Sequence, residues 1–267
     1  MRLNRIAAVV LRQFYLLRGS PTRLLPMFSW VAIDIVLWGF ITRYLNGFAS
    51  GGFNFVPSLL GAVLLWGFLT RVMQGVTQAF FEDVWSRNFL NVFATPLKIS
   101  EYVAGLVTIG VCTSLVGLVV MLALATLVFG LSIFAYGLAI IPFMMVLFLT
   151  GIALGVAASA VVLRLGPASE WFIWPIPSLI SPFVGVFYPL AILPGWMQMV
   201  SRVLPPSYVF EGMRAVVAGR GVQPAQLLWG AGLSIVYIVL AGAFFAAIYR
   251  YAIRTGLIAR YSAETVT

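Results

Sequence analysis

Long runs of apolar residues, separated by short polar segments, are the dominant pattern of this chain. No Asp, Glu, Lys, Arg or His occurs between residues 102 and 163. The hydrocarbon core of a bilayer is about 30 Å thick and takes about 20 apolar residues per helical pass. This run therefore predicts two passes, with a break at residues 130–137, and indicates that lipid is the solvent for most of the chain.

The same pattern continues on both sides of that run and predicts six apolar spans. No stretch of the sequence indicates a separate soluble domain, so we expect one transmembrane domain over residues 1–267. The expected fold is an all-α integral membrane protein with six transmembrane helices. The predicted spans are 24–42, 56–81, 102–129, 136–163, 171–193 and 227–249.

Residues 2–18 show a different pattern, in which apolar residues recur at steps of three and four while arginines lie elsewhere on the helical wheel. Such a segment predicts an amphipathic helix lying in the membrane interface. We expect it within residues 1–20, ended by the Gly-Ser-Pro step at 19–21. Its apolar positions are Leu3, Ile6, Val10, Phe14 and Leu17, and its basic positions are Arg5, Arg12 and Arg18.

Composition supports a membrane protein and orients it. The 267-residue chain is 62% hydrophobic and 9% charged, whereas an ordinary globular protein is about 25% charged. Its net charge is +9, and basic residues that flank apolar spans suit the anionic cytoplasmic leaflet better than nucleic acid. The positive-inside rule predicts two cytoplasmic termini. That orientation leaves few of the basic residues outside: Arg43, Arg202, Arg214 and Arg220.

The residue types that carry most enzymatic chemistry are missing. Cys112 is the only cysteine and histidine is absent, which excludes a Cys/His metal cluster and a Ser-His-Asp triad. Lys98 is the only lysine, and no glycine-rich phosphate loop surrounds it. We therefore expect no catalytic residue, no metal site and no cofactor in this chain. If the protein is driven by ATP, another polypeptide hydrolyses it.

The fifth span is rich in proline, which removes a backbone donor and clashes with the preceding turn. In lipid the freed carbonyls need protein or water partners, so we expect this span to be bent and packed inside the protein. After it, the Pro-Pro pair at 205–206 breaks a short helix, and Glu211 and Arg214 lie three apart on the next one. This predicts re-entrant half-helices within 182–220; the alternative is a plain outer loop.

The segment 82–101 mixes charges with aromatic residues at helical spacing. Such a helix suits docking into a groove of another protein, and an interfacial helix without a partner is the open alternative. The residues concerned are Glu82, Asp83, Trp85, Arg87 and Phe89.

Asp34 lies near the middle of the first span, where an ionisable group is costly and marks a candidate functional site. Arg71 lies in the second span at a shallower depth from the same side. We interpret the two as a structural intramembrane ion pair in preference to a transport site.

Several of these features occur together in one known family. The basic amphipathic start, the charged inner segment ending in Thr-Pro-Leu at 95–97 and the proline-rich fifth span come in order along the chain. They are followed by Tyr-Pro-Leu at 188–190, Pro194 and the Pro-Ser-Tyr-x-x-Glu-Gly-x-Arg run at 206–214. Together these resemble the membrane permeases of type-2 ABC exporters.

The resemblance implies a half-transporter that dimerises with a second copy or a paralogous permease and docks onto a cytoplasmic ABC ATPase, which binds the ATP and Mg. It implies a coupling helix within 82–98, with Glu82, Asp83 and Arg87 facing the ATPase. It also implies that 183–206 closes the outer end of the pathway. The expected outer-gate residues are Pro189, Pro194, Glu211 and Arg214.

The function expected from these observations is that of an ABC exporter permease in a bacterial inner membrane, moving an amphiphile such as a lipid, a lipid-linked glycan or a drug. The alternative is an ion-gradient-driven transporter, which usually carries more intramembrane acids than Asp34 alone. A membrane enzyme is disfavoured because no cluster of carboxylates could hold a metal. Candidate path residues are aromatic or uncharged: Trp66, Phe68, Gln74, Phe183, Phe187 and Tyr188.

Overall fold

The computed structural model describes residues 2–19, 21–48, 55–85, 92, 95–166 and 169–257, and every regular element in these ranges is a helix. The N-terminal half contains α1 (Leu3–Arg18), α2 (Pro21–Phe48), η1 (Val56–Leu60), α3 (Gly61–Trp85) and α5 (Ile99–Phe129). The C-terminal half contains η2 (Ile133–Ala139), α6 (Ile140–Leu165), α7 (Glu170–Ile173), α8 (Ile176–Val184), η4 (Leu190–Ile192), α9 (Gly195–Val203), α10 (Pro205–Val217) and α11 (Pro224–Arg254).

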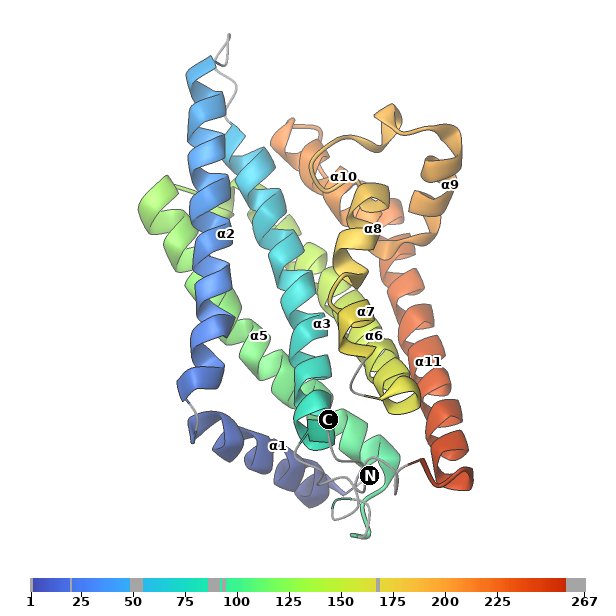
Figure 1. Cartoon of the computed structure of the whole chain (residues 1–267). Coiled ribbons are helices and arrows are strands. Elements are labelled where there is room, and N and C mark those ends of the chain that lie inside the picture. Colours follow the sequence, from blue (N-terminus) through green and yellow to red (C-terminus); the bar gives the residue numbers. More distant parts are fainter. Residues whose placement is uncertain are drawn as a thin grey trace.

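The long helices α2, α3, α5, α6 and α11 run lengthwise through the molecule (Figure 1). Helix α1 lies across one end of this bundle, which we call the α1 end, and α9 and α10 lie at the opposite end, the α9 end (Figure 1). The C-terminal end of α11 also lies at the α1 end (Figure 1).

Four helices of the described part are long and apolar enough to cross a bilayer. At about 1.5 Å per residue, a helix of 30 residues is about 45 Å long and exceeds the hydrocarbon core. The chain is therefore a multi-pass membrane protein. The four are Val56–Trp85, Ile99–Phe129, Tyr136–Leu165 and Pro224–Arg254.

The predicted first and fifth spans, 24–42 and 171–193, are not among these four. Helix α2 is continuous over 28 residues, as the pattern at 24–42 predicts. The fifth span is shorter than predicted, because the apolar helix covers only Trp171–Val184. A helix over Trp171–Val184 reaches about 21 Å, less than the hydrocarbon core. The predicted continuation to 193 is wrong because Gly185 takes a left-handed conformation, φ +67°, and ends α8.

The core lies where α6 packs between α3 and α11. Gly151 and Gly155 of α6 lie directly against α3, since a Cβ at Gly151 would come within 2.9 Å of the Leu69 carbonyl oxygen. A Cβ at Gly155 would lie 2.8 Å from the Cβ of Val76. Small residues therefore let the two helices approach closely, as in membrane bundles generally. The small-residue face of α6 thus serves packing within the chain.

Candidate functional site

At the α1 end, one buried carboxylate joins three helices. Asp83 of α3 is 1% exposed. Its carboxylate accepts hydrogen bonds from Arg12 Nη2 of α1 at 2.5 Å, from Gln13 Nε2 at 3.4 Å and from the Tyr102 hydroxyl of α5 at 2.7 Å. A buried charge requires such partners, because an isolated one is expensive to remove from water. The Asp83 cluster therefore fixes α1 to α3 and α5.

A second carboxylate, that of Glu101 in the first turn of α5, is also bonded to α1. Glu101 accepts from the backbone N–H of Arg2 at 2.8 Å, from Arg5 Nη1 at 3.2 Å and from the backbone N–H of Lys98 at 3.1 Å. Its bond to Lys98 caps the N-terminus of α5, where orphan backbone donors need acceptors. Its bonds to Arg2 and Arg5 hold the start of α1.

Helix α1 presents its polar side to the protein. Gln13 is 1% exposed and donates to the Ala79 carbonyl at 3.1 Å, and Val9 packs against Gly105 of α5. The outward face is apolar, with Leu3 80% and Tyr15 64% exposed. The predicted helix is present as Leu3–Arg18, and the side chains of Arg5 and Arg12 bind internal carboxylates.

The contact of Glu82 and Asp83 with an ATPase stays a prediction. Both are buried, at 7% and 1% exposure, because the last turn of α3 lies within the bundle. Arg12 lies 71 residues from Asp83, so no local spacing in the sequence could reveal the pair. Trp85 is 46% exposed at the end of α3. Arg87 and Phe89 lie outside the described residues.

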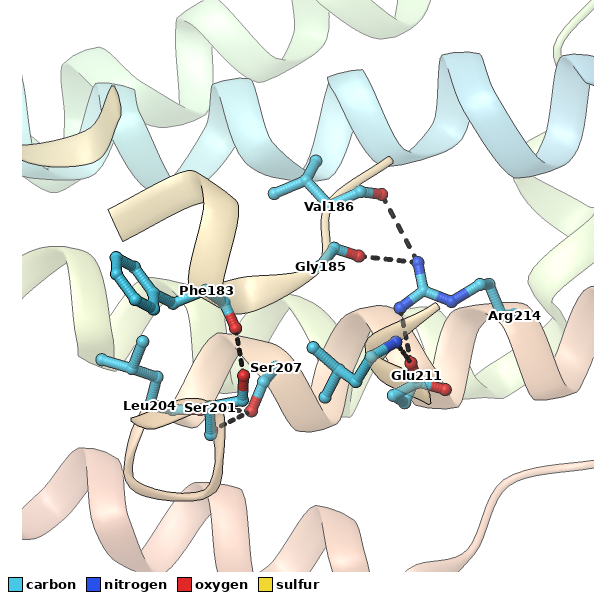
Figure 2. Close-up of polar contacts among 9 residues, drawn as sticks. Phe183, Gly185, Val186, Ser201, Leu204, Ser207, Glu211 and Arg214 are labelled. Atoms are coloured by element: carbon cyan, nitrogen blue, oxygen red, sulfur yellow. Dashed lines mark hydrogen bonds and ion pairs between the residues drawn. The ribbon is translucent and has the colours of Figure 1, made fainter. Parts of the chain in front are cut away.

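At the α9 end, Glu211 and Arg214 of α10 clamp the chain reversal that follows α8. Glu211 Oε1 accepts from the Leu190 N–H at 2.8 Å and from Arg214 Nη2 at 2.9 Å. Arg214 Nη1 donates to the Gly185 carbonyl at 2.7 Å (Figure 2). The planar guanidinium thus binds a carboxylate and a backbone carbonyl together. The two residues lie three apart on one helix, as the sequence predicts, and form an ion pair. Their attachment to the 185–190 turn was not foreseen.

Two serines hold the break between α9 and α10. The Ser201 hydroxyl donates to the Phe183 carbonyl at 2.5 Å, and the Ser207 hydroxyl donates to the Ser201 carbonyl at 2.6 Å (Figure 2). Both side chains are buried. Their hydroxyl groups give hydrogen-bond donors to backbone carbonyls at the point where the helix is interrupted before Pro205. Sequence reasoning missed these serines, because serine is common and nothing in its spacing marks a partner.

The predicted gate prolines begin the short elements of this region. Pro189 precedes η4 and Pro194 precedes α9, each with an extended ψ near 145° that turns the chain. Neither proline contacts the Glu211–Arg214 pair through a hydrogen bond described here. The four predicted gate residues therefore lie in one stretch of the fold, residues 185–217. Glu211 and Arg214 bind it through their side chains, and Pro189 and Pro194 accept backbone hydrogen bonds through their carbonyls.

The predicted path residues lie on α3 and on the stretch from the end of α8 to Tyr188. Phe187 stacks on Trp38 of α2, with ring centroids 4.7 Å apart. Phe183 meets Trp196 at 5.9 Å, and the Tyr188 hydroxyl donates to the Pro182 carbonyl at 2.7 Å. In α3, Phe68 is buried in the core, and Gln74 and Trp66 are half-buried.

Asp34 and Arg71 lie on neighbouring helices, α2 and α3, and their charges interact electrostatically. Asp34 is exposed on the single chain, whereas Arg71 is half-buried. The Arg71 side chain lies against Gly117 of α5, where a Cβ would come within 3.1 Å of its Cδ. The ion pair stays a prediction.

Within the described ranges no group of three or more His, Cys, Asp or Glu could hold a metal ion. Comparison with protein-family models finds that residues 5–218 match the model of the ABC-2 type transporter membrane proteins. This stretch includes almost all of α1, the α3–α5 connection and the α8–α10 unit. No curated protein matches the chain.

Proposed function

Since the chain belongs to the ABC-2 type transporter family, we propose that it is the permease of an exporter powered by ATP hydrolysis in a separate subunit. The substrate is an amphiphile: a lipid, a lipid-linked glycan or a drug. It passes between this chain and a second copy or a paralogous permease. The family match over residues 5–218 is the observation that carries the proposal.

The ATPase docks at the α1 end of the bundle. The ATPase itself binds the ATP and Mg. Family members work with such an ATPase subunit, and this chain has no phosphate loop of its own. The protein resides in a bacterial inner membrane with both termini cytoplasmic. In support, α1 and the C-terminal end of α11 lie at the same end of the bundle (Figure 1).

The segment 82–98 couples the ATPase to the spans. Asp83 lies near the end of α3 and Glu101 lies near the start of α5, so the two residues flank the connection between these helices. Both carboxylates are bonded to α1. A displacement of this segment therefore moves α1, α3 and α5 together. Trp85, which is exposed, supplies apolar docking area with Phe89, while Arg87 adds charge complementarity.

The 185–217 unit forms the outer gate. Its chain reversal is held by side chains of α10 rather than by a continuous helix, so it can move as one body relative to α3 and α6. Phe187 links it to α2 through Trp38. Tyr188 lies on the same unit, and Phe183 lies at the end of α8, just before it. These residues contribute to the path together with Trp66 and Gln74.

The second candidate is an ion-gradient-driven transporter that uses Asp34, which is exposed on the single chain. Copurification followed by reconstitution separates the two. The tagged chain is isolated with the P-loop ATPase encoded beside it, bound amphiphiles are identified by mass spectrometry, and their transport is measured in vesicles. We expect transport to require ATP and an intact phosphate-loop lysine in the ATPase, and to persist when ionophores collapse all ion gradients. Transport without the ATPase, driven by an imposed gradient, would overturn the proposal.

A further inference from the structure

A cavity of about 320 Å³ lies inside the single chain, between α3, α6, α8, α10 and α11. Its walls include Thr150 and Ala157 from the middle of α6, and Tyr237 and Phe244 from the middle of α11. Both helices cross the bilayer, so the cavity lies at the depth of the hydrocarbon core. One chain supplies all of its walls.

The walls of this cavity are almost entirely apolar. Two lining residues carry hydroxyl groups, and both hydroxyls are already used. The Thr150 hydroxyl donates to the Val146 carbonyl at 2.8 Å and lies 3.0 Å from Ser234 Oγ. The Tyr237 hydroxyl donates to the Val203 carbonyl at 3.1 Å. A polar headgroup would therefore find few partners here.

Water does not suit this space, because an ordered water needs two to four polar partners. An empty space loses the dispersion contacts of its lining atoms, and apolar cavities of about 150 Å³ are known to accept apolar guests. The cavity opens beside α11, where Leu240 and Phe244 are 59% and 42% exposed. At this depth the medium outside the opening is lipid hydrocarbon.

We propose that the cavity binds one acyl chain of a phospholipid from the surrounding bilayer, which enters laterally past Leu240 and Phe244. The headgroup stays outside, at the α9 end, where the cavity approaches Leu204 and Pro205. Moving a chain from lipid to this site gains little hydrophobic free energy, since both environments are apolar. Binding is therefore driven by close packing and by the high concentration of lipid.

The acyl chain contacts the helices that lead to the proposed outer gate and to the proposed coupling segment. Ile180 belongs to α8, which leads into the outer gate, and Trp66 belongs to α3, which leads to the coupling segment. An occupied cavity therefore holds α8 at a fixed distance from α11. The inference stands on the cavity alone and is independent of the ATPase.

The test uses the full chain in vesicles of phosphatidylethanolamine that contain a phosphatidylcholine with a diazirine in the middle of one acyl chain. After illumination and digestion, mass spectrometry maps the adducts. We expect adducts on residues 150–157 and 237–244 that exceed those on the lipid-facing side of α5. Ala157→Phe, which fills the cavity from α6, should remove the excess, and Ala243→Phe on the exposed side of α11 should preserve it.

Ile180→Trp fills the cavity from the opposite wall and replaces Ala157→Phe if that variant does not yield a monodisperse protein. Adducts spread evenly over all lipid-facing helices in the wild type would overturn the proposal. An excess that survives whichever filling variant is monodisperse would overturn it as well.

Discussion

At the scale of single residues, buried polar groups are placed where helices from distant parts of the chain must be held together. Asp83 receives Arg12, Gln13 and Tyr102, and Glu211 receives Arg214 and a backbone N–H. Each carboxylate is thereby compensated by donors from more than one segment. Removal of such a group leaves its donors buried without an acceptor, which costs more than the bond itself contributes.

Asp83→Asn should destabilise the protein by about 2 kcal/mol, the range for a hydrogen bond to a charged group, because Arg12 loses its counter-charge. Thermal unfolding in detergent measures this. Arg12→Gln should cost a similar amount, and the double variant should cost less than the sum. The control is Arg18→Gln on the same helix, at an exposed position, which should be neutral. Additive losses in the cycle would contradict the contact.

Gly185→Ala should destabilise the outer turn by about 1–2 kcal/mol, the cost of a left-handed backbone for an L-residue. The added Cβ would also lie 2.9 Å from the Tyr188 carbonyl oxygen. Gly195→Ala is the matched control, because a Cβ there meets nothing within 4 Å. Protease sensitivity of residues 185–195 in vesicles reports the turn. Equal sensitivity of the two variants would show that the turn tolerates a side chain.

At the scale of elements, the interrupted helices α8, α9 and α10 behave as one unit because side chains replace missing backbone bonds. Ser201 and Ser207 fasten the α9–α10 break, and Arg214 fastens the end of α8. The prolines that prevent a continuous helix therefore make this polar network necessary. The long helices need no such network, because their backbone bonds are all internal.

Arg214→Lys keeps the positive charge but loses the planar fork that reaches both Glu211 and the Gly185 carbonyl. We expect normal insertion and dimerisation with transport reduced by at least about tenfold, which corresponds to about 1.4 kcal/mol. Reconstituted transport and gel filtration measure the two properties. Arg220→Lys, at an exposed position, serves as the control. Full transport by Arg214→Lys would show that the clamp has no part in the gate.

The α2–α3 contact yields a second test at this scale. Asp34→Asn and Arg71→Gln should each lower the folded yield, because each leaves the other charge uncompensated within the membrane. The double variant should recover part of the yield. Fluorescence-detected gel filtration of a tagged protein gives all three values. Strictly additive losses would mean that the two charges act separately.

At the scale of the whole molecule, the hydropathy pattern predicts α3, α5, α6 and α11 because each is long and apolar enough to cross a bilayer. It also predicts α2 as a continuous helix. It fails at 171–193, where the left-handed Gly185 ends the helix and contacts with α10 decide the path of the chain. It also does not report the burial of Asp83, which accepts hydrogen bonds from α1, a helix distant in sequence. Partners such as Arg12 and Ser207 are set by tertiary packing, which no local spacing reports.

The orientation of the whole chain is tested with a reporter fused after Thr267. The positive-inside asymmetry predicts activity only on the cytoplasmic side. A second fusion after Gly221, in the turn that precedes α11, should report the opposite side. Activity of the two fusions on the same side would contradict six crossings.

The docking of α1 has a consequence for the order in which the protein is made. Its acceptor Asp83 is synthesised 71 residues after Arg12, and Tyr102 a further 19 residues later. During translation the arginines of α1 therefore have no internal partner until α3 and the start of α5 have left the ribosome. Until then the apolar face of α1 and its attraction to anionic lipid keep this helix at the membrane surface. Helix α1 is thus fixed only after helices that follow it in the chain have been inserted.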